Sequence, residues 1–373
     1  MTSDITAIPQ SAAPAASKKR LLSLDVMRGL TVAFMVIVNN GAGPESYLHL
    51  SHSEWNGITL CDLVFPFFLF IMGITTYLSL SKRNFAPSGA TIRKIVKRTL
   101  IILIIGWAIH WFSNVCHGKG LLDFGHLRLT GVLTRIALCY GVVSLLSLAL
   151  SRKAMAWTAA ALLIIYGAIL LLFNGYENGP ANVNAIVDHL LLPDGLLYTK
   201  RPVDPEGILG TVPAIAHTII GFCCGAILAS REPLDRRLLR LFVCGALLIA
   251  GGFLLSGILP ANKRIWSPSY VLITCGLAAA LLATISWFVD ERGMRRGLGF
   301  FESFGVNPLF LYVVADILGI IFGSFSVSKA IYASLFAAIG NPQLASAIYA
   351  VGLMLLTGLI GLPLYLKKIY IKI

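Results

Sequence analysis

The chain has 373 residues, of which 57% are hydrophobic and only 13% are charged, and its mean hydropathy is +0.81. A soluble domain usually contains about half apolar and about a quarter charged residues. Repeated apolar runs of about 20 residues match the length of helix that crosses the hydrocarbon core of a bilayer. The sequence therefore predicts an integral membrane protein, an all-α polytopic bundle of transmembrane helices.

Apolar windows, taken in chain order, predict ten membrane spans. They lie at 24–39, 60–80, 97–113, 131–150, 154–173, 209–229, 238–257, 269–288, 304–323 and 344–366. The segment 327–340 is apolar but too short to cross, so we expect an interfacial or re-entrant helix there; if it does cross, the count becomes eleven. Residues 1–20 are rich in Ala, Pro and Ser and then basic, which predicts a disordered cytoplasmic tail ahead of a single transmembrane domain at 21–373.

The net charge of +13 could suggest a nucleic-acid partner, but the positions of the basic residues argue otherwise. With ten spans, one face of the membrane carries 21 Lys and Arg residues and the other carries seven, while Arg28 and Arg135 fall within spans. The positive-inside rule places the basic face, with both termini, in the cytoplasm. This accounts for the charge, so we expect no nucleic-acid partner.

Several polar residues lie within or near the spans, where each needs a partner or a function. Asp25 and Arg28 are three residues apart at the inner end of the first span, and they either neutralise each other or contact a cytosolic anionic ligand. Arg135 lies near the outer end of the fourth span and is expected to pair with Asp62, with another outer carboxylate, or with an anionic ligand group. Asn307 near the ninth span is a candidate for an interhelical hydrogen bond.

The connection between the first two spans is unusually polar. It lies on the outer face, contains no Lys or Arg, and holds His49, His52, Glu54 and Trp55 within a few residues. The two histidines lack the H-E-x-x-H spacing of a zinc site, so we expect no metal. Imidazole titrates near neutral pH, and the neighbouring polar side chains can orient it, which favours His52 as a general base or nucleophile.

Six motifs resemble, in chain order, the heparan-alpha-glucosaminide N-acetyltransferase family, including its bacterial NagX-like members. They are "LLSLDVMRGLTVAFMVIVNNGAG", "SHSEWNGITLCDLVFPFFLFIMG", "GVLTRIALCY", "DPEGILGTVPAI", "WSPSYVLITCGLA" and "FGVNPLFLYV", and they extend over residues 21–366. The resemblance implies a multi-pass enzyme of the bacterial inner membrane that transfers acetyl from cytosolic acetyl-CoA to the amine of a glucosamine on the far side. The family's histidine, asparagine and arginine fall on His52, Asn39 and Arg135.

These observations combine into a hypothesis for the site. His52 is the base or nucleophile. Asn39, or Asn40 in its place, donates a hydrogen bond to the oxyanion, and Asp62 or Glu54 fixes the histidine tautomer. The candidates for substrate binding are Asn40, Glu54, Trp55, Arg135 and Asn307. The candidates for binding acetyl-CoA are Arg28 and Asp25. Acetyl-CoA is expected to serve as the acetyl donor, without a metal.

The expected partners are acetyl-CoA, an amino-sugar or glycan acceptor and the lipid bilayer, with a homodimer considered as the assembly. The alternative is a permease for an amino sugar or another small polar solute, because polar groups within spans can also line a transport path.

Overall fold

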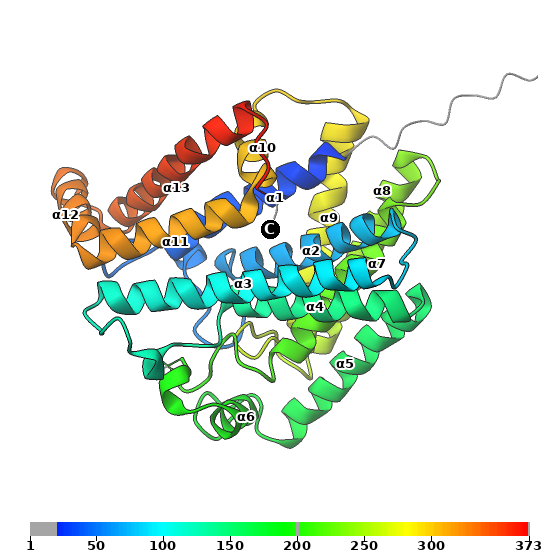
Figure 1. Ribbon diagram of the computed structural model, residues 1–373, viewed down its shortest axis with the longest axis horizontal. Coiled ribbons are helices and arrows are strands. Elements are labelled where there is room, and N and C mark those ends of the chain that lie inside the picture. Colours follow the sequence, from blue (N-terminus) through cyan, green and yellow to red (C-terminus); the bar gives the residue numbers. More distant parts are fainter. Residues whose placement is uncertain (1–20, 199–200, 372–373) are drawn as a thin grey trace, which may run out of the picture.

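The computed structural model describes residues 21–198 and 201–371, in which the chain is helical and contains no β-strand. The proposed tail at 1–20 lies outside these residues. The thirteen α-helices of the described residues (Figure 1) are α1 Leu22–Asn39, α2 Val64–Ser81, α3 Gly89–Cys116, α4 Val132–Ala149, α5 Arg152–Leu172, α6 Val183–Leu191, α7 Thr211–Leu228, α8 Leu234–Ser256, α9 Pro268–Ser286, α10 Gly299–Val306, α11 Pro308–Ser324, α12 Val327–Ile339 and α13 Pro342–Leu366.

The predicted spans correspond closely to these helices. Within the described residues, nine helices are long and apolar enough to cross a membrane, and the bent pair α10–α11 makes a tenth candidate. The segment predicted to be too short to cross forms α12, a helix of 13 residues. The all-α membrane bundle predicted from hydropathy is therefore confirmed.

The ninth predicted span, 304–323, corresponds to α11 together with the end of α10. The structure breaks it at Asn307, where α10 and α11 meet at 90°. Pro308 has no N–H to donate and disfavours the helical conformation in the residue before it, and Asn307 accordingly has φ −126° and ψ 55°.

The helices form two groups around α1 and α7. In Figure 1, α10, α11 and α13 gather near α1, while α2, α4, α5 and α9 pack around α7. The α2–α7 contact is close because glycines face each other: a Cβ atom on Gly73 would lie 2.2 Å from the carbonyl oxygen of Thr218. Small residues let helix backbones approach in a membrane, where apolar area alone does not drive association.

Three connections meet at one end of the bundle. Trp55, in the α1–α2 connection, donates its indole N–H to the carbonyl of Tyr176, in the α5–α6 connection, at 2.9 Å. Gly57 donates its backbone N–H to the carbonyl of Ala261, in the α8–α9 connection, at 2.8 Å. The polar α1–α2 connection is thus held in place by two distant parts of the chain.

Candidate active site

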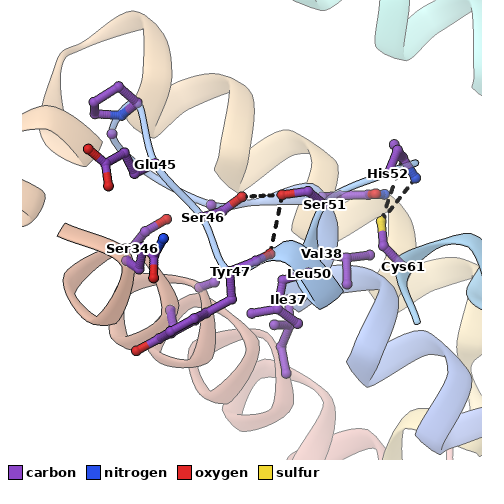
Figure 2. A pocket seen from close by; sticks show the side chains of 17 residues that line it. Ile37, Val38, Glu45, Ser46, Tyr47, Leu50, Ser51, His52, Cys61 and Ser346 are labelled. Atoms are coloured by element: carbon purple, nitrogen blue, oxygen red, sulfur yellow. Dashed lines mark hydrogen bonds between the residues drawn. The ribbon is translucent and has the colours of Figure 1, made fainter. Parts of the chain in front are cut away.

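A cavity of about 270 Å³ opens where α1 ends, between the α1–α2 connection and the start of α13. Figure 2 shows His52 and Cys61 at one end of it and Glu45 and Ser346 toward the other. Asn39, the last residue of α1, also lines it. The remaining polar lining comes from Ser46, Tyr47, Ser51 and Gln343. Much of the cavity lining is therefore polar, and the cavity lies beside the end of α1 and the start of α13.

His52 is held by a buried carboxylate. Asp62, in the turn that leads into α2, is completely buried, and its Oδ1 lies 2.8 Å from Nδ1 of His52. The other oxygen, Oδ2, accepts the backbone N–H groups of Ser53 at 3.1 Å and Thr59 at 3.0 Å. The connection is therefore folded around the carboxylate, and these hydrogen bonds favour its ionised form.

Two groups of opposite charge approach Nδ1 of His52. The carboxylate of Asp62, which only accepts hydrogen bonds, lies 2.8 Å from it, and the ammonium of Lys263, which only donates, lies 2.9 Å from it. The His52 side chain remains 49% exposed, whereas Asp62 is fully buried. This arrangement orients an accessible imidazole base beside the cavity.

Lys263 is the cation of this site. Its Nζ lies 2.9 Å from Nδ1 and 3.2 Å from Nε2 of His52, and 3.7 Å from Oδ1 of Asp62. Its side chain is only 11% exposed. The Cys61 sulfur also contacts the ring, at 3.1 Å from Nδ1.

The structure does not pair Arg135 with Asp62, the first partner considered for it. Arg135 is buried in α4, donates from Nη2 to the carbonyl of Gly207 at 3.0 Å, and lies with Cζ 5.0 Å from the ring centroid of Trp266. Its Nε and Nη1 have no hydrogen-bond partner among the described residues. Lys263 stands beside Asp62 instead.

With this geometry in view, comparison with known proteins places the chain. The profile of the family described as "Heparan-alpha-glucosaminide N-acetyltransferase, catalytic" matches residues 20–242, more than half of the chain. The chain belongs to this family. Heparan-alpha-glucosaminide N-acetyltransferase of Homo sapiens is 29% identical over 355 residues, which cover 79% of this chain and 52% of the human protein. The protein of the same name from Mus musculus is 29% identical over 364 residues, covering 81% of this chain and 54% of the mouse protein.

The chain therefore spans about half the length of the curated relatives it matches. The region matched by the family profile contains Asn39, His52 and Asp62 but ends before Lys263. The resemblance of the sequence motifs to this family is confirmed by the match.

The other candidates near His52 have different surroundings. Asn40 donates its amide N–H to the carbonyl of Val36 at 2.9 Å, one turn back in α1. Glu54 is exposed, and within the described residues no hydrogen bond joins it to His52. Trp55 is anchored by its N–H to the α5–α6 connection. Asn39 is thus the candidate beside His52 that faces the cavity.

A second group of candidates lies at the opposite end of α1. Arg28 contacts Asp25 at 3.1 Å, as the self-neutralising interpretation predicted, and also donates to the carbonyl of Gly305 at 3.0 Å. Asn307 donates to the carbonyl of Ile369 at 2.9 Å and so holds the C-terminal segment. Arg28 and Asn39 are separated by 11 residues of α1, or about 16 Å at 1.5 Å per residue. Asp25, Arg28 and Asn307 therefore lie too far from His52 to contact the same reacting atom.

Two residues of the site were missed by the sequence reasoning. Cys61 adjoins Asp62, so its proximity to the site could have been noticed. Lys263 is 211 residues from His52 in the chain, and no motif connects the two. Within the described residues, no group of three or more His, Cys, Asp or Glu side chains is arranged to hold a metal ion.

Proposed function

We propose that the protein is a transmembrane N-acetyltransferase, which transfers the acetyl group of cytosolic acetyl-CoA to the amine of a glucosamine-type sugar on the other side of the membrane. The observation that carries this proposal is the His52–Asp62 pair, 2.8 Å apart, beside a polar cavity that Asn39 also lines. The names of the human and mouse relatives supply the reaction class.

In this mechanism His52 acts as the general base. Nε2 takes a proton from the acceptor ammonium, the free amine attacks the thioester carbonyl carbon, and the carbon–sulfur bond breaks. The CoA thiolate leaves and takes up the second proton that the amine nitrogen loses as the amide forms, while Asn39 donates a hydrogen bond to the tetrahedral oxyanion. A two-step variant, in which Nε2 attacks the thioester first and passes acetyl from the imidazole to the amine, uses the same groups.

The donor would reach this site from the opposite end of the bundle. The connections at that end carry most of the basic residues, whose field attracts the phosphates of CoA. Arg28 and Asp25 lie at that end and are candidates for contact with the donor. The pantetheine arm would then pass between helices toward His52. The membrane in this proposal is the bacterial inner membrane.

The test uses membranes that contain the protein, acetyl-CoA labelled in the acetyl group, and a panel of amino sugars and amino-sugar glycans. We expect label on an amine of one acceptor, and a loss of about 100-fold or more in His52→Ala and Asp62→Asn, because general-base catalysis contributes about 10²–10⁴. The measurement is the initial rate of label transfer.

Two variants serve as matched controls. His49 is an exposed histidine of the same connection, so His49→Ala should retain activity. Asp194→Asn removes the carboxylate of an exposed histidine pair, His189–Asp194, which has a similar separation of 2.7 Å. Uptake of unmodified sugar without label transfer would overturn the proposal and support a permease. Labelled protein formed without acceptor, and lost in His52→Ala, would select the two-step variant.

A further inference from the structure

The cavity beside His52 has two chemically different ends. His52 and Cys61 lie at one end, and the carboxylate of Glu45 lies toward the other (Figure 2). Among the residues that line the cavity there is no Lys or Arg, and Glu45 is the one acid. Lys263 is held against Asp62 and is not part of the lining. The end of the cavity that lies away from the base is therefore negative.

The backbone on both sides of Glu45 is held in place. Gly43 has φ 82°, and the ring of Tyr332 in α12 lies so close that a Cβ atom on Gly43 would be 2.3 Å from its Cζ. On the other side, the hydroxyl groups of Ser46 and Ser51 form a hydrogen bond (Figure 2). The Glu45 carboxylate itself is exposed and forms no ion pair with the described residues. Its charge is thus available to whatever occupies the cavity.

We propose that Glu45 is a specificity-determining residue, and that the acceptor places in the cavity one amino-sugar ring without an anionic group. This inference rests on the proposed acetyl transfer. The cavity volume of about 270 Å³ is below the roughly 300–1,000 Å³ of sites for drug-sized ligands, which suits a single ring. Ser346 and Gln343, from α13, supply a hydroxyl and an amide to the lining, and both groups form hydrogen bonds with sugar hydroxyls.

The geometry of a hexosamine matches its two ends to the two ends of the cavity. The amine is on carbon 2, and carbon 5, which bears the exocyclic carbon 6, lies across the ring from it. With the amine at His52, a substituent on carbon 6 therefore points toward Glu45. A hydroxyl there donates to the carboxylate, whereas a sulfate is repelled by it. Two like charges about 4 Å apart weaken binding about fivefold even in water-like surroundings.

The experiment compares glucosamine with glucosamine 6-sulfate, which differ by one anionic group on carbon 6. With the detergent-solubilised full chain and labelled acetyl-CoA, kcat/KM for glucosamine should exceed that for the 6-sulfate by about fivefold or more. Glu45→Gln keeps the shape of the side chain and removes its charge, so the two values should become nearly equal. Glu45→Lys should reverse the preference.

Glu177→Gln is the matched control, because it removes an exposed carboxylate of the α5–α6 connection that does not line the cavity. It should keep the wild-type ratio of the two kcat/KM values. Raising the ionic strength from about 0.01 M to about 1 M should shrink the ratio in wild type and leave it unchanged in Glu45→Gln. Discrimination that persists in Glu45→Gln would overturn the proposal, because it would then come from shape. Equal values in wild type, or a preference for the 6-sulfate, would overturn it as well.

A binding measurement separates this proposal from the proposed function. Calorimetry of the full chain carrying His52→Ala, titrated with each of the two sugars, needs no acetyl transfer. Glucosamine should bind more tightly than its 6-sulfate, and the addition of Glu45→Gln should abolish the difference. If the wild-type protein acetylates neither sugar, the proposed function fails, while calorimetry still decides the role of Glu45. If neither sugar binds to the folded protein, the assignment of Glu45 fails.

Discussion

Asp188 shows how much a single buried carboxyl contributes to the pH response of the protein. It lies in α6 and is 2% exposed; Oδ1 accepts the backbone N–H of Ile208 at 2.8 Å, and Oδ2 has no partner among the described residues. Burial raises its pKa to about 6, and the negative charge of Asp204 acts in the same direction, against the hydrogen bond from Ile208 and the charge of Arg135.

This pKa predicts a stability that falls as pH rises. The folded state holds the Asp188 proton more tightly than the unfolded state, so the carboxyl stabilises the fold below about pH 4, and this contribution is lost as pH rises through the folded pKa of about 6. The Asp188→Asn variant has no carboxyl at this position, so this pH-dependent contribution to stability is absent. Its stability relative to wild type should rise by about 1 kcal/mol between pH 5 and pH 7.5.

Melting temperatures in detergent at the two pH values measure this difference. Asp235→Asn, at an exposed carboxyl of α8, is the control and should show no such change. A constant difference between Asp188→Asn and wild type across this range would show that Asp188 is already ionised in the folded protein at pH 5.

At the residue scale, the sequence predicted what lies close together in the chain. His52 and Asp62 are ten residues apart within one polar connection, and their pairing could be expected from that spacing and from the carboxyl that Asp62 provides just before α2. Lys263 was out of reach, because its contact depends on how α8 and α9 place their connection. The pairing of Asp62 with Arg135 was considered because Arg135 is the cation of a nearby span. Hydropathy could not show that the α8–α9 connection would bring a different cation to Asp62.

At the element scale, hydropathy located the spans because each must be apolar over the thickness of the bilayer. Hydropathy did not show the bend at Asn307, because α10 and α11 are both apolar and the hydropathy average over a stretch of sequence extends across the break. The proline at 308 was the available signal, because a residue before proline avoids the helical conformation. The position of the bend matters, as it sets α10 against α1.

The contact between α1 and α10 is limited by glycine. A Cβ atom on Gly305 would lie 1.9 Å from the carbonyl oxygen of Asp25, which cannot move without displacing α1. We expect Gly305→Ala to destabilise the protein by about 2 kcal/mol or more, the usual cost of overpacking. Gly299→Ala, in the same helix, meets nothing within 4 Å and should be neutral or slightly stabilising.

The melting temperature in detergent measures this effect. Protease resistance of the C-terminal segment reports in addition whether the contacts of Arg28 and Asn307 are retained. Equal melting temperatures for the two alanine variants would mean that α10 moves freely relative to α1, and that the close approach does not constrain the fold.

At the scale of the whole molecule, charge and geometry together predict a direction for the reaction. The ten spans predicted from the sequence put 21 Lys and Arg residues on one face and seven on the other, and from this excess the positive-inside rule predicts that the His52 end faces away from the cytoplasm. The first helix, α1, has 18 residues and is about 27 Å long, close to the thickness of the hydrocarbon core, and it separates the Arg28 end from the His52 cavity. Donor and acceptor should therefore enter from opposite sides.

Sealed membrane vesicles test this direction. With labelled acetyl-CoA outside and an amino-sugar acceptor trapped inside, inside-out vesicles expose the basic face to the donor and should accumulate labelled product in the lumen. Right-side-out vesicles prepared in the same way should form little product, because the donor then meets the wrong face and CoA does not cross the bilayer unaided. Inside-out vesicles that carry His52→Ala control for leakage and for other transferases. Product that forms equally in both kinds of vesicle, or only when donor and acceptor share one compartment, would contradict a transfer across the membrane and place both substrates at the same mouth of the protein.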